Sequence, residues 1–265
     1  MLGSIAGDII GSRFEFHNLK SKDFRLFDRH CHFTDDTVMT IAVARTLASF
    51  KDGINDDNEF KQKLILDMHI VGKKYPRCGY GGNFYDWIMN DYYRPYNSWG
   101  NGSAMRVSAI ALYAKSLEEC EHIAKLSAEV SHNHPEGVKG AMVTAGATYL
   151  ARTHKSKDEI KTYILNYYKL DKSVDEIRKD YEFDVSCQGS IPQAMTCFLE
   201  SDSFEDCMRN AISIGGDSDT IAAIVGSVAE YYYGAPAYLE VVVKSYLDDY
   251  LNTELDNALE VLKNR

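Results

Sequence analysis

The stretch Thr34-Asp35-Asp36-Thr37 runs directly into an apolar repeat of helical period, and the later stretch Gly216-Asp217-Ser218-Asp219-Thr220 does the same. Each stretch therefore places carboxylates in the first turn of a helix, where backbone N–H groups and the helix dipole favour negative charge. Either stretch alone is explained as an ordinary acidic helix start. Together they hold four carboxylates and several hydroxyls, and such oxygen-only ligands suit Mg²⁺, Mn²⁺ or Ca²⁺ rather than zinc. Unneutralised, these charges could not lie together away from water, so the pair predicts a site for two divalent cations.

Helical periodicity extends over the rest of the chain. It predicts helices at about 2–12, 35–49, 57–73, 83–90, 103–115, 118–130, 137–152, 203–213 and 217–232, and two more after Pro236. The capping boxes Ser156-x-x-Glu159 and Ser173-x-x-Glu176 begin two further helices, and Pro192 is placed in the first turn of another. Long alternating runs of β-branched residues are absent. The sequence therefore predicts an all-α fold, a compact orthogonal multi-helix bundle, as one domain spanning 1–265.

Composition limits the classes of function. The chain has 265 residues, 45% of them hydrophobic and 26% charged, and a formal net charge of −10. This charge argues against general nucleic-acid binding, which depends on clustered Lys and Arg. The N-terminus lacks a basic flank and no apolar stretch approaches membrane-spanning length, so we expect a cytoplasmic protein that does not bind membranes. We also expect a monomer. The six cysteines form no CxxC pair and are expected to be free thiols.

Three glycines, Gly3, Gly7 and Gly11, lie on one face of the first predicted helix. Each costs roughly 1 kcal/mol relative to Ala in a helix, so close backbone packing against another helix should compensate. The most economical partner is one of the two acidic helices. Glu15, which follows between two aromatic residues, is then either a surface residue or a carboxylate beside the cations.

Aromatic residues alternate with glycines between Cys78 and Gly102, a mixture that suits the wall of a planar-ligand site better than a core. The turn Gly100-Asn101-Gly102 and the residues up to Arg106 resemble a dinucleotide fingerprint, but Met105 replaces the third glycine and no strand precedes it. The turn still predicts an anion site at a helix N-terminus. His132 and His134, in the turn before the next helix, either bond a ligand oxygen or cap that helix.

Five motifs together resemble the ADP-ribosylglycohydrolases, the family that includes the dinitrogenase-reductase-activating glycohydrolase. They are Gly7-Asp8-x-x-Gly11, Thr34-Asp35-Asp36-Thr37, Gly79-Tyr80-Gly81, Gly100-Asn101-Gly102-x-Ala104-Met105-Arg106 and Gly215-Gly216-Asp217-x-Asp219-Thr220, and they span nearly the whole chain. The resemblance implies an all-α fold with two Mg²⁺ or Mn²⁺ ions in a central cleft. It also implies hydrolysis of the glycosidic bond between ADP-ribose and its acceptor.

The resemblance carries roles over to matched positions. The implied metal ligands are Thr34, Asp35, Asp36, Asp217, Asp219 and Thr220, and the implied catalytic carboxylates are Glu15, Asp35 and Asp217. The implied substrate-binding residues are Tyr80, Gly81, Ser98, Trp99, Gly100, Asn101, Gly102, Ser103, Met105 and His132. In this interpretation the turn from Gly100 holds the pyrophosphate with His132, while Trp99, or less favourably Tyr93, stacks on the adenosine. Residues 183–188 are expected to line the same pocket.

The acceptor stays open: the loops 17–31 and 52–58 carry no motif, so the partner is an ADP-ribosylated protein or an ADP-ribosyl small molecule. Arginine, serine or another side chain would each fit. The alternatives are a catalytically silent ADP-ribose-binding protein and a two-metal phosphoesterase. A nucleophilic pair of Cys187 and His132 is less favoured because no third residue orients it.

Overall fold

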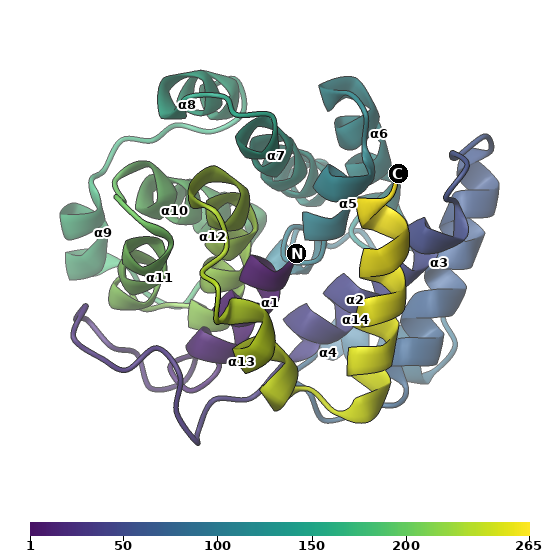
Figure 1. Ribbon diagram of the computed structural model, residues 1–265, viewed down its shortest axis with the longest axis horizontal. Helices are drawn as coiled ribbons and strands as arrows, with labels where there is room; N and C mark the ends of the chain where they lie inside the picture. Colours follow the sequence, from purple (N-terminus) through teal and green to yellow (C-terminus); the bar gives the residue numbers. More distant parts are fainter.

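A computed structural model describes residues 1–265 as fourteen α-helices and one short 3-10 helix, which confirms the all-α prediction (Figure 1). The α-helices are α1 (Leu2–Gly11), α2 (Asp35–Ser49), α3 (Asp57–Gly72), α4 (Gly82–Met89), α5 (Ser108–Tyr113), α6 (Leu117–Glu129), α7 (Pro135–Arg152), α8 (Lys157–Leu165), α9 (Val174–Asp180), α10 (Cys187–Leu199), α11 (Phe204–Ser213), α12 (Ser218–Tyr233), α13 (Leu239–Tyr246) and α14 (Asp249–Lys263). The 3-10 helix η1 spans Asn101–Ser103. None of the helices combines the length and apolar character needed to cross a bilayer.

Helix α1 lies near the middle of the molecule, beside α12, and every one of its residues is buried (Figure 1). The two backbones touch where both sequences have small residues. A Cβ added to Gly7 would lie 2.1 Å from the carbonyl oxygen of Ala222, and one added to Gly226 would lie 2.0 Å from that of Gly3. The predicted close partner of the glycine face is therefore confirmed, and it is one of the two acidic helices.

The carboxylate of Asp8, near the end of α1, fixes the start of α2. It accepts hydrogen bonds from the backbone N–H and the hydroxyl of Thr34, and from the same two groups of Thr37. Helix α1 also contacts the first turn of α12 through Gly11, where an added Cβ would lie 2.4 Å from Cα of Asp219. Helix α1 therefore contacts both acidic stretches. The two stretches are thus brought together by a third element.

Two predicted boundaries were wrong. The helix expected from 103 begins only at Ser108, because Ala104 and Met105 turn their N–H groups back to the carbonyl of Asn101 and form η1 first. Helix α10 begins at Cys187, because the side chain of Ser186 caps it by accepting the N–H of Gly189. Pro192 consequently lies inside α10 rather than in its first turn.

Replacing Gly7 with alanine tests the backbone contact between α1 and α12. Although alanine favours helix by about 1 kcal/mol, we expect Gly7→Ala to lower the free energy of unfolding by about 1–3 kcal/mol because the new methyl overpacks the contact. Urea denaturation measures this change. Gly82→Ala is the matched control, since nothing lies within 4 Å of its added Cβ. A Gly7→Ala protein as stable as Gly82→Ala would contradict the contact.

Candidate active site

A cavity of about 450 Å³ opens where α2, α12, η1 and the segment before α10 meet. This volume is in the range of small-molecule sites. Its lining combines residues predicted from the two acidic stretches with residues of the glycine turn. The sequence-predicted residues that line it are Glu15, Asp35, Asp36, Gly81, Ser98, Gly100, Asn101, Gly102, Met105, His132, Asp217, Asp219 and Thr220.

The carboxylates at one end of the cavity form two groups that share a residue. One oxygen each of Asp8, Asp36 and Asp219 lie within 4.8 Å of one another, and so do one oxygen each of Glu15, Asp217 and Asp219. Asp219 is thus a member of both groups of three carboxylates. Asp35 belongs to neither set, although it lines the same cavity.

The members of the first group differ in how their oxygens are used. Both oxygens of Asp8 accept hydrogen bonds from Thr34 or Thr37, so this residue mainly positions α2. In Asp36, Oδ2 accepts the hydroxyl of Thr220 at 3.2 Å, whereas Oδ1 is buried and has no hydrogen-bond partner. A buried carboxylate oxygen without a donor is costly unless a cation or another ligand satisfies it.

Burial and mutual repulsion disfavour the charged forms of these carboxylates. Burial, and then the charges of neighbouring carboxylates, hold the pKa values of Asp35, Asp36 and Asp219 well above their usual range. Burial raises the pKa of Asp217 to about 6, although a hydrogen bond from Asn101 Nδ2 at 2.7 Å opposes the rise.

Glu15 lies in the second carboxylate group, as the packing of the glycine face predicts. Burial, with the charges of Asp219 and Asp8, raises its pKa to about 8. The residue is only partly buried and lines the cavity, so it can meet a ligand. The structure thus places Glu15 in the cavity beside the other carboxylates, and its part in the reaction stays a prediction.

The donors in this end of the cavity fit hard divalent cations. All of them are carboxylate or hydroxyl oxygens, and the set contains no thiolate and no imidazole. Arg106 is the cation in the lining, but its guanidinium donates to the carbonyl of Ser127 and the hydroxyl of Ser131 rather than to a carboxylate. No protein cation therefore neutralises the cluster, as a divalent ion would.

The glycine turn lines the same cavity, and most of its N–H groups bond within the protein. Those of Gly100 and Asn101 donate to Ser98 Oγ and to the carbonyl of Val185. The N–H of Gly102 takes part in no such bond, so it remains for a ligand. The turn therefore offers an anion fewer free N–H groups than the sequence predicts, because Ser98, Val185 and the bonds of η1 take up the other donors.

His132 faces this turn and is held as a neutral ring. A Cβ added to Gly102 would lie 3.1 Å from His132 Nε2. Burial, and then the nearby charge of Arg106, hold the pKa of His132 well below its usual value. Its Nδ1 lies 2.8 Å from Ser131 Oγ, which also accepts a hydrogen bond from Arg106 at 3.0 Å. The Ser131 hydroxyl can then donate to Nδ1, and in that tautomer Nε2, which faces Gly102, carries the proton.

Trp99 is not part of the cavity lining, contrary to the sequence-based expectation. Residues 98–100 are extended beside residues 185–187, and Gly100 pairs with Ser186 in an isolated β-bridge. Successive side chains of an extended segment point to opposite sides. Ser98 and Gly100 face the cavity, and Trp99 therefore points outward, 52% exposed and edge-on to His134.

Three other proposed site residues and Tyr93 are also absent from the cavity lining. The hydroxyl of Tyr80 donates to the carbonyl of Gly72, and that of Ser103 to the carbonyl of Gly137. The hydroxyl of Thr34 donates to Asp8, and Tyr93 packs on His69 outside the lining. Tyr80, Ser103 and Thr34 thus bond groups that do not line the cavity, and Tyr93 lies apart from it.

Several lining residues were missed by sequence reasoning. Phe84 and Tyr96 supply aromatic walls, and Phe16 and Phe183 stack at the rim with ring centroids 6.2 Å apart. Phe183 and Val185 come from the segment expected to line the pocket. For the other aromatic residues, the sequence shows only that aromatic side chains are dense in this part of the chain. That density does not indicate which ring faces the cavity.

Comparison with known proteins identifies the relatives of this chain. A family model described as ADP-ribosylglycohydrolase matches residues 1–263. The human protein named ADP-ribosylhydrolase ARH3 is 26% identical over 315 residues, covering 88% of this chain and 84% of its own. The Pseudomonas putida (strain GB-1) protein named ADP-ribosylarginine hydrolase Tri1 is 27% identical over 299 residues, covering 98% of this chain and 78% of its own.

A solved structure supports the fold. The chain titled ADP-ribosylglycohydrolase-related protein complex superposes with a TM-score of 0.71 and 21% sequence identity. The superposition covers 99% of this chain and 95% of that chain. The arrangement of helices is therefore one already seen in a solved structure.

Removing one charge from the shared carboxylate tests the electrostatics of the site. In EDTA we expect Asp219→Asn to be at least as stable as the wild type, because the buried like charges repel less. Added Mn²⁺ should stabilise the wild type by about 2.7 kcal/mol at 100 times its Kd and leave the variant unchanged. Thermal unfolding measures both effects.

Asp171→Asn, which removes only an exposed charge, is the control and should respond to Mn²⁺ as the wild type does. Equal stabilisation of Asp219→Asn and the wild type by Mn²⁺ would show that the cluster does not bind the ion.

Proposed function

Since the chain belongs to the ADP-ribosylglycohydrolase family, we propose that it hydrolyses the glycosidic bond between ADP-ribose and an acceptor. The observation that carries this proposal is the meeting of the two acidic stretches in one cavity, which is also lined by a turn with an N–H free for an anion. Carboxylates favour the positive charge that develops at the anomeric carbon of ribose, and the turn suits a pyrophosphate.

The proposed cofactors are two divalent cations, Mg²⁺ or Mn²⁺. Their ligands would come from Asp35, Asp36, Asp217, Asp219 and Thr220, the oxygens of which face one cavity. Thr34 would join them through one lone pair of its hydroxyl oxygen, which donates its proton to Asp8 and accepts the N–H of Asp36 at 3.4 Å. When bound, the cations would polarise the ribose oxygens and lower the pKa of a nearby water.

The carboxylates of the cavity have different proposed roles in the hydrolysis. Water forms a bond to the anomeric carbon while the bond from that carbon to the acceptor breaks, and the acceptor leaves with a proton. Glu15 accepts the proton of the attacking water, or it occupies the ribose position until the substrate displaces it. Asp217, which is oriented by the amide of Asn101, and Asp35 flank the same space as further carboxylates.

The substrate's anionic part is assigned to the glycine turn and His132. The N–H of Gly102 and the Nε2 proton of His132 are the donors available to a pyrophosphate there. A hydrogen bond to a charged group contributes about 1.5–3 kcal/mol. Phe84, Tyr96 and Phe183, rather than Trp99, offer the aromatic surface for a planar ring.

The acceptor is proposed only as a class: a side chain of an ADP-ribosylated protein, or a small molecule carrying ADP-ribose. One relative is named for ADP-ribosylarginine and others simply for ADP-ribose. Both names fit the proposed bond.

The direct test is incubation with peptides ADP-ribosylated on serine or on arginine, with Mg²⁺ or Mn²⁺ and with EDTA. We expect free ADP-ribose from at least one linkage, and none in EDTA.

The variant Glu15→Gln separates the two roles proposed for Glu15. Loss of a proton acceptor should lower kcat by about 10²–10⁴-fold, whereas loss of a gate should mainly change KM.

Chromatography of the products distinguishes the rival functions. Release of AMP would identify a phosphoesterase, and tight binding of ADP-ribose without turnover would identify a binding protein. Wild-type kcat and KM in Glu15→Gln would remove Glu15 from the mechanism.

A further inference from the structure

The side-chain amide of Asn18 joins two backbone segments that are far apart in sequence. Its Oδ1 accepts the N–H of Gly216 at 2.7 Å, and its Nδ2 donates to the carbonyl of the same residue at 3.0 Å. The same Nδ2 also donates to the carbonyls of Phe14 at 2.8 Å and Glu15 at 2.9 Å. Both ends of the amide are thus fully used, although Asn18 is exposed.

These contacts involve the residues that position one carboxylate group. Glu15 contributes its own carbonyl, and Gly216 directly precedes Asp217 in the chain. Gly215 and Gly216 both have positive φ angles, 72° and 77°, so this turn uses a backbone conformation that few residues adopt and that the amide holds in place. Asn18 is therefore shared by the backbones that carry Glu15 and Asp217.

We propose that Asn18 is a positioning residue that holds Asp217 where it can bind a cation and Glu15 beside it, within the second carboxylate group; this inference rests on the proposed function. Groups that orient metal ligands commonly affect metal affinity although they do not touch the ion. No residue type other than asparagine or glutamine offers an amide with both an acceptor and two donors. Glutamine is longer by one methylene, which would shift the amide away from one of the two segments.

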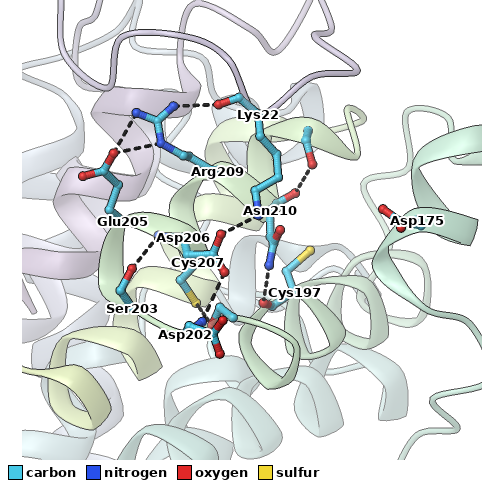
Figure 2. Close-up of polar contacts among 12 residues, drawn as sticks. Lys22, Asp175, Cys197, Asp202, Ser203, Glu205, Asp206, Cys207, Arg209 and Asn210 are labelled. Atoms are coloured by element: carbon cyan, nitrogen blue, oxygen red, sulfur yellow. Dashed lines mark hydrogen bonds and ion pairs between the residues drawn. The ribbon is translucent and has the colours of Figure 1, made fainter.

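Asn18 belongs to the loop between α1 and α2. Further contacts fix this loop farther from the carboxylates. Lys20 Nζ donates to the carbonyls of Tyr181 and Ile214 at 2.7 and 2.5 Å. Figure 2 shows the outermost attachment, where Arg209 on α11 binds both Glu205 and the carbonyl of Lys22. The loop therefore stays attached to α11 when Asn18 is changed, so an Asn18 variant tests local spacing rather than loss of the loop.

The experiment measures Mn²⁺ binding, by the electron paramagnetic resonance of free Mn²⁺, without any substrate. We expect Asn18→Leu, which keeps the branched shape of the side chain and removes its hydrogen bonds, to bind Mn²⁺ about 10–100-fold more weakly. Circular dichroism shows whether each protein is folded.

Asn18→Asp separates positioning from charge. It keeps an acceptor for the N–H of Gly216 but cannot donate to the three carbonyls. If charge alone set the affinity, the extra carboxylate would strengthen Mn²⁺ binding. Positioning by the amide predicts weaker binding.

Asn252→Leu is the matched control. Its Nδ2 also donates to two carbonyls, those of Lys244 and Leu247, but the residue lies at the junction of α13 and α14 and outside the cavity lining. We expect this variant to keep the wild-type affinity for Mn²⁺.

Wild-type affinity in folded Asn18→Leu, or tighter binding in Asn18→Asp, would overturn the inference and leave the proposed function intact. Equal weakening in Asn18→Leu and Asn252→Leu would also overturn it, because general destabilisation would then explain both. A wild-type protein that binds no Mn²⁺ would overturn the proposed metal site and the role of Asn18 with it.

Discussion

The backbone contact between α1 and α12 is the constraint on which the site depends. Helices with ordinary side chains pack with their axes 8–10 Å apart, whereas added Cβ atoms on Gly7 and Gly226 would lie only 2.1 and 2.0 Å from opposing carbonyl oxygens. This closeness brings the end of α1 to the first turn of α12. Because Asp8, one turn earlier, holds Thr34 and Thr37, the first turn of α2 arrives at the same place. The small residues of α1 and α12 thus allow the two acidic helix N-termini to lie side by side.

That alignment has an electrostatic cost that makes chemical sense only with a ligand. Five carboxylates of the cavity and Asp8 behind them lie close together, and burial is the leading cause of the raised pKa in each of them. Folding opposes such a cluster unless a cation compensates it. The protein supplies no ion pair there, and Asp36 Oδ1 lacks even a hydrogen-bond donor. Strained electrostatics of this kind are typical of sites that bind charged ligands.

Much of this could be predicted from the sequence, for physical reasons. Helical periodicity and capping residues mark the elements because they act locally, and the glycine spacing of α1 required a close partner. The orientation of Trp99 could not be predicted, since it depends on an extended pairing with residues 185–187. The same holds for Asp8, whose motif is visible but whose role follows from the three-dimensional meeting of α1 with α2. Arg106 was matched within a motif, yet only the structure reveals its link through Ser131 to His132.

The central claim is that the two acidic stretches form one site for two cations. Anomalous diffraction at the manganese edge, from crystals grown with Mn²⁺, tests it most directly. The account predicts two anomalous peaks flanking the carboxylate of Asp219, one toward Asp36 and the other toward Asp217 and Glu15. Peaks elsewhere on the surface, or none in the cavity at saturating Mn²⁺, would contradict it.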